Sequence, residues 1–136
     1  MALKICGNIV VPNISGCNTT SGNLAVGYNS LTANTTGTCN TALGFNSLCN
    51  NTTGTYNTSV GYSSLPNNTL GSQNVAIGPS TLNTNISGCN NISVGYQSLY
   101  NNLTNNNVAI GTCSGCSITT GTNNTIIGSL SAAAGC

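Results

Sequence analysis

The chain has 136 residues and almost no charge: Lys4 is its one basic residue, and it contains no Asp, Glu or His. Acid–base catalysis needs His or a carboxylate, nucleic-acid binding needs a basic patch, and calcium sites need carboxylates. The composition therefore argues against an enzyme, a metal or cofactor site and a nucleic-acid partner, while near-zero net charge favours association between copies.

Residues 1–22 precede a regular repeat. Within them, residues 3–11 are apolar and rich in β-branched side chains, as is typical of a strand. We interpret residues 1–22 as a strand that caps the repeats or pairs with a neighbouring copy. The apolar run is too short for a signal-peptide core, and no stretch is long enough for a membrane-spanning helix, so membrane insertion is not expected.

Residues 23–131 repeat one phrase seven times. Each copy contains a glycine, and successive glycines are separated by 17, 17, 17, 17, 16 and 17 residues. This glycine column consists of Gly27, Gly44, Gly61, Gly78, Gly95, Gly111 and Gly128. Four residues before each glycine is an asparagine, and this asparagine column consists of Asn23, Asn40, Asn57, Asn74, Asn91, Asn107 and Asn124.

Apolar side chains also recur at fixed positions. The residue before each glycine forms an aliphatic column: Val26, Leu43, Val60, Ile77, Val94, Ile110 and Ile127. The residue before that is small in six copies (Ala25, Ala42, Ser59, Ala76, Ser93 and Ala109), and Ile126 is the exception. Four residues after the glycine, the first five copies have Leu31, Leu48, Leu65, Leu82 and Leu99.

A period of 17 residues is too short for repeats built from helix pairs. The copies are rich in Asn, Gly, Thr and β-branched residues, which favour turns and strands over helices. The sequence therefore predicts an all-β fold, a parallel β-solenoid or β-roll of about seven 17-residue coils, stacked into a rod roughly 30 Å long. We expect the asparagine column to form an amide ladder. The glycine column should mark a sharp bend or a close approach of backbones.

Side chains alternate along a strand, so the small residues and the aliphatic column should face opposite sides. Small residues suit a thin interior, which would leave the aliphatic column outside as a stripe of subunit contacts. In the alternative, the leucines and the aliphatic column both pack inside a wider coil.

Residues 74–78 read NVAIG and are followed by PST, and residues 91–99 read NISVGYQSL. These phrases resemble the head repeats of trimeric autotransporter adhesins. The phrase GTYNTSVGYSSL resembles Asn-Thr-Ala-x-Gly repeats in fibre proteins of bacteria, phages and giant viruses. The resemblance covers residues 23–128. It implies a left-handed parallel β-roll, commonly trimeric, that serves as a fibre or adhesive shaft.

Eight cysteines suggest an oxidising destination. A disulfide joins Cα atoms within about 7 Å, so only cysteines in the same or adjacent coils can pair within a chain. The candidates for intrachain bonds are Cys39, Cys49, Cys113 and Cys116; Cys39 and Cys49 could pair only if their coil folds back on itself. The candidates for intersubunit bonds are Cys6, Cys17 and Cys136, which lie near the ends, and residues 132–136 read as a tail.

These features predict a structural, self-assembling fibre or filament subunit, reinforced by disulfides. Its partner would be itself, as a homotrimer or a head-to-tail filament. The predicted location is extracellular or on the surface of a virion or spore-like particle, where Asn-x-Ser/Thr sequons are candidates for surface glycans. The alternative is an adhesive or ice-binding module, although the threonines form no regular array.

Overall fold

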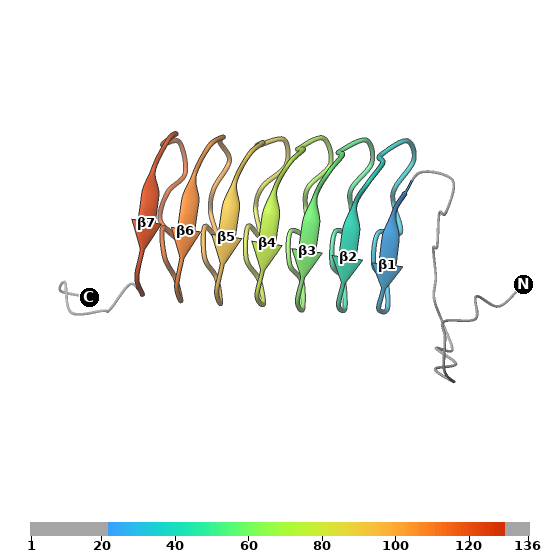
Figure 1. Cartoon of the computed structure of the whole chain (residues 1–136), viewed down its shortest axis with the longest axis horizontal. Helices are drawn as coiled ribbons and strands as arrows, with labels where there is room; N and C mark the ends of the chain where they lie inside the picture. Colours follow the sequence, from blue (N-terminus) through green and yellow to red (C-terminus); the bar gives the residue numbers. More distant parts are fainter. Residues whose placement is uncertain (1–21, 130–136) are drawn as a thin grey trace, which may run out of the picture.

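In the computed structural model, the described part of the chain is residues 22–129, and it forms seven strands of three residues each. The strands are β1 (Leu24–Val26), β2 (Thr41–Leu43), β3 (Thr58–Val60), β4 (Val75–Ile77), β5 (Ile92–Val94), β6 (Val108–Ile110) and β7 (Thr125–Ile127). They lie side by side in chain order as one parallel sheet (Figure 1). This arrangement is the predicted all-β parallel β-solenoid.

The register of the strands follows the repeat in the sequence. Ala25 of β1 pairs with Ala42 of β2, one full period later. Between β5 and β6, Ile92 pairs with Val108, and this separation is one residue shorter than in the other strand pairs. The copy with 16 residues is therefore shortened in a turn and not in a strand. Equivalent residues of the repeat stay paired in all neighbouring strands from β1 to β7.

The turns of each coil rely on backbone in the left-handed region, which few non-glycine residues adopt. Besides the glycine column, positive φ angles recur two and four residues after each of its first six glycines, as at Asn46 (φ 54°) and Leu48 (φ 50°). They also recur just before each asparagine of the asparagine column, as at Tyr56 (φ 58°). Leu48 is fully buried, so the packing of its side chain offsets the cost of an unfavourable backbone conformation.

The core is thin and built from two columns. The small residues at the centre of each of β1 to β6 are at most 1% exposed, and the five leucines are at most 5% exposed. Alanine and serine let the opposite wall of the coil approach closely, while one leucine per coil fills the remaining space. The aliphatic column is not part of this core, so the wider-coil alternative is wrong.

The sixth coil departs from this plan. Gly115 stands where the other described coils have a leucine, and Ile126 of β7 stands where they have alanine or serine. A Cβ atom added at Gly115 would lie 3.3 Å from the Cδ1 atoms of both Ile118 and Ile126. The two isoleucines thus fill the space left by the missing leucine, which accounts for the exceptional residue in β7.

Several predictions concern residues outside the described part of the chain. They are the strand expected at residues 3–11, the tail at residues 132–136, and the intersubunit cysteines Cys6, Cys17 and Cys136.

Candidate functional site

The glycine column lies where each coil leaves its strand, and it combines a bend with close backbone contact. Gly61 has a φ angle of 136°, which disfavours any side chain. A Cβ atom added there would also lie 2.7 Å from the carbonyl oxygen of Gly78 in the next coil. Both explanations offered by the sequence therefore apply at the same residue.

The asparagine column is buried and bonds to the backbone of neighbouring segments. Each Oδ1 accepts a hydrogen bond from the backbone N–H of the next asparagine in the column, at 2.7 to 3.0 Å. The side-chain nitrogen of Asn57 donates to the carbonyl oxygen of Gly71 at 2.8 Å, and Asn40 bonds to Gly54 in the same way. The column is therefore a ladder, but most of its rungs join a side chain to backbone rather than one amide to another.

A second asparagine column forms the amide ladder that was expected of the first. It consists of Asn34, Asn51, Asn68, Asn85 and Asn102. The side-chain nitrogen of Asn68 donates to Oδ1 of Asn51 at 2.8 Å, and that of Asn85 donates to Oδ1 of Asn68 at 2.9 Å. This column was not predicted, because its residues begin segments that read as turns. Two features of the sequence could have indicated this column. Its five asparagines are 17 residues apart, and each of the first four is followed three residues later by a glycine.

The second asparagine column is interrupted at the copy that is one residue shorter than the others. The side-chain nitrogen of Asn102 donates to the carbonyl oxygen of Thr104 at 2.8 Å instead of to Asn85. Oδ1 of Asn85 is the one buried side-chain oxygen or nitrogen in residues 22–129 that lacks a hydrogen-bond partner. The shortened copy lacks the glycine of the Asn-x-x-Gly phrase, and Thr104 takes the place of that glycine. The carbonyl oxygen of Thr104 accepts hydrogen bonds from the side chains of Asn91 and Asn102, as the glycine carbonyls do in the other coils.

We expect that inserting one glycine between Thr104 and Asn105 stabilises the protein by about 1–2 kcal/mol, because Asn102 would then reach the orphaned oxygen of Asn85. The measurement is the free energy of unfolding in urea. The matched control inserts a glycine between Gly71 and Ser72, where the coil already has its full length, and it should destabilise. Equal losses from both insertions would contradict this account of the short coil.

The outer face of the sheet is apolar and uncharged. In β1 to β6 the central residue is buried, while the first and third residues are exposed or half-buried. The third residues form the aliphatic column, in which Leu43 is 45% exposed and Ile77 is 40% exposed. The first residues are Leu24, Thr41, Thr58, Val75, Ile92, Val108 and Thr125. These two columns together are called the outer sheet face.

An aromatic column follows the glycine column and extends the apolar surface. The rings of Tyr28 and Phe45 stack with centroids 5.5 Å apart, and those of Phe45 and Tyr62 with centroids 5.3 Å apart. Tyr96 occupies the same place three copies after Phe45 and is also exposed. The sequence analysis did not single out this column, although an aromatic residue follows the glycine in four copies.

The five cysteines within residues 22–129 are free thiols. Cys39 is exposed just before β2, whereas Cys49 is buried in the turn after β2, where its thiol donates to the carbonyl oxygen of Pro66 at 3.4 Å. Burial raises the pKa of the Cys49 thiol, which favours its protonated form. Cys113 and Cys116 share one turn after β6.

Sequons differ in accessibility. Among those in the described part, Asn50, Asn67 and Asn123 are exposed. Asn51, Asn57, Asn85, Asn91 and Asn102 are buried and hold the coils together. Only the exposed asparagines leave room for a glycan.

Residues 22–129 contain no cluster of three or more Cys, His, Asp or Glu able to hold a metal ion. That region also contains no helix with the length and hydrophobicity needed to span a membrane.

No family model, curated protein or solved structure matches this chain.

Proposed function

We propose that the protein is a structural subunit that assembles with copies of itself into a fibre or filament on the surface of a cell or particle. The observation that carries the proposal is the outer sheet face, an uncharged apolar surface presented by a rigid stack of coils. Eight cysteines support an oxidising location, and the absence of Asp, Glu and His from the sequence leaves little chemistry for catalysis.

The outer sheet face suits association between identical copies. A stable interface buries roughly 800 Å² on each partner. The outer sheet face runs along a stack roughly 30 Å long, and the neighbouring aromatic column adds the exposed parts of four large side chains. Because the face contains no charged group, covering it requires no ion to lose its water.

The regular spacing of the coils adds specificity to this association. Every coil presents the same pair of outward positions, so two copies can interdigitate side chains along the full length of the sheet. A homotrimer and a filament are the two assemblies in which this face would be covered.

The test is a charge placed on the outer sheet face. Ile77→Lys changes an exposed side chain of β4 and should leave the fold intact, but it should abolish assembly because the lysine would be desolvated in the interface. Sedimentation velocity measures the assembly, and circular dichroism checks the fold. The matched control is Leu103→Lys, which changes an equally apolar side chain, 48% exposed, that is not in the sheet.

The control variant should assemble like the unaltered protein. Loss of assembly in both variants would show that the added charge acts without regard to its place, and persistence of assembly in Ile77→Lys would exclude the outer sheet face as the contact surface.

A further inference from the structure

Cys113 and Cys116 lie on a single tight turn. The backbone N–H of Cys116 donates a hydrogen bond to the carbonyl oxygen of Cys113 at 3.2 Å. A turn of this kind brings the Cα atoms of its first and fourth residues within about 7 Å. That separation is within the range over which two cysteines form a disulfide.

The repeat itself shows that side chains at these two positions meet. In the first coil the same positions hold Asn29 and Thr32, because the register of the coils aligns Cys113 with Asn29 and Cys116 with Thr32. There the hydroxyl of Thr32 donates to Oδ1 of Asn29 at 3.0 Å. Burial, followed by the nearby thiol of Cys113, raises the pKa of Cys116, as expected for two sulfurs close together.

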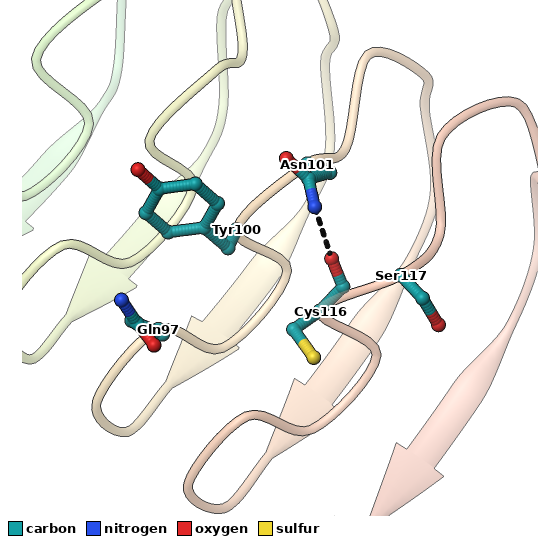
Figure 2. A pocket seen from close by; sticks show the side chains of 5 residues that line it. All are labelled: Gln97, Tyr100, Asn101, Cys116 and Ser117. Atoms are coloured by element: carbon teal, nitrogen blue, oxygen red, sulfur yellow. Dashed lines mark hydrogen bonds between the residues drawn. The ribbon is translucent and has the colours of Figure 1, made fainter. Parts of the chain in front are cut away.

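The turn that carries the two cysteines also lacks the usual anchor. In the five preceding coils a buried leucine, such as Leu48 or Leu99, fixes this turn to the core. In the sixth coil Gly115 takes its place and contributes no side chain. The turn is held by hydrogen bonds instead. The hydroxyl of buried Ser114 donates to the carbonyl oxygen of Ile126 at 3.1 Å, and the side-chain nitrogen of Asn101 donates to the carbonyl oxygen of Cys116 at 2.9 Å (Figure 2).

Cys116 is open to a reactant from solution. It lines a surface hollow of about 380 Å³ together with Gln97, Tyr100, Asn101 and Ser117. Figure 2 shows Gln97 and Tyr100 of the preceding coil across the hollow from Cys116. These walls are uncharged and polar, so a small polar disulfide meets no electrostatic barrier there.

We propose that Cys113 and Cys116 are a redox modification site, which a low-molecular-weight disulfide such as glutathione disulfide oxidises to an intrachain disulfide. The bond replaces the missing leucine as the constraint that fixes this turn. The inference concerns the single chain and does not depend on assembly.

The chemistry is thiol–disulfide exchange. The Cys116 thiolate attacks one sulfur of the incoming disulfide, breaks its S–S bond and releases one thiol. The Cys113 thiolate then attacks the Cys116 sulfur of the mixed disulfide and releases the second thiol. The two cysteines lose two protons and two electrons, and the two electrons reduce one glutathione disulfide to two glutathione thiols.

The first test incubates the purified full-length chain with glutathione buffers of graded redox ratio, blocks the remaining thiols and maps the linked peptides by mass spectrometry. The expected product links Cys113 to Cys116 and appears at a more reducing ratio than any link involving Cys39, Cys49 or Cys89. Two free thiols, a glutathione adduct that persists on Cys116, or pairing of either cysteine elsewhere would overturn the proposal.

The second test measures amide hydrogen exchange in the turn. Oxidation should slow exchange of the Cys116 and Ile118 amides by about tenfold or more, since the turn is otherwise weakly anchored. The same treatment of Cys113→Ser should leave these rates unchanged. Unchanged rates in the oxidised unaltered chain would overturn the role of the bond as an anchor.

A matched control moves the pair to a turn that keeps its leucine. The double substitution Asn29→Cys, Thr32→Cys places a pair at the corresponding exposed positions of the first coil, beside the buried Leu31. This pair should also form a disulfide, but exchange in that turn should change little on oxidation. A similar slowing in both turns would show that the bond does not compensate for Gly115.

Discussion

Replacing Gly61 with alanine is expected to lower the free energy of unfolding by at least about 3 kcal/mol. Two costs combine at this residue. The φ angle of 136° disfavours a side chain, and the added Cβ would lie 2.7 Å from the carbonyl oxygen of Gly78. Urea unfolding followed by circular dichroism measures the loss.

The end of the described stack provides the matched control. Gly128 has nearly the same backbone conformation, with a φ angle of 128°, but an added Cβ would meet no atom of residues 22–129 within 4 Å. Gly128→Ala should therefore cost only the backbone strain, about 1–2 kcal/mol. If both substitutions lower the free energy of unfolding by the same amount, the close approach of neighbouring coils is not the reason that glycine is needed.

Asn57→Ala should destabilise the protein by about 3–5 kcal/mol, because it removes a fully buried amide from the asparagine column. The loss would leave the backbone N–H of Asn74 without its partner at 3.0 Å, and it would leave the carbonyl oxygen of Gly71 with only the hydrogen bond from the side chain of Asn68. Both groups lie in the interior of the stack, where water does not replace the lost bonds. The measurement is again the free energy of unfolding.

The control for this substitution is an asparagine that also bonds to the next coil but is exposed. The side-chain nitrogen of Asn50 donates to Oδ1 of Asn67 at 3.3 Å on the surface. Asn50→Ala should change stability by less than about 0.5 kcal/mol, because water replaces the lost bond. A large loss at Asn50, or a small one at Asn57, would contradict the importance of burial.

The fold could be predicted from the sequence because the repeat constrains it so strongly. A phrase that returns at so regular a period must place equivalent residues in equivalent surroundings, and a copy this short holds one strand and its turns. The exceptions were equally informative. Ile126 breaks the small-residue pattern, and the structure shows that it fills the space that Gly115 leaves empty.

The details that escaped prediction depend on the conformation of the turns. Leucine and tyrosine are disfavoured at positive φ, so nothing in the sequence indicated that Leu48 and Tyr56 adopt it. Unless the conformation of these turns is known, the direction of each asparagine side chain cannot be predicted. The amide ladder was therefore expected at Asn57 and its equivalents. Amide-to-amide bonds do form there, between Asn57 and Asn74 and between Asn107 and Asn124, but the more continuous ladder runs through the second asparagine column.

The candidate site was only partly visible in the sequence. Strict alternation within a strand indicated that the aliphatic column faces opposite to the small residues. The other outward column mixes Leu, Thr, Val and Ile, so it has no identical phrase to mark it. The aromatic column becomes apparent only once Tyr28, Phe45 and Tyr62 are stacked on one another.

Negative-stain electron microscopy of the purified full-length chain tests the central claim, that these stacked coils are built to join their copies, most directly. The account predicts objects larger than one stack, either filaments or bundles of rods packed side by side. Fields of separate single rods, each roughly 30 Å long at every protein concentration, would contradict it.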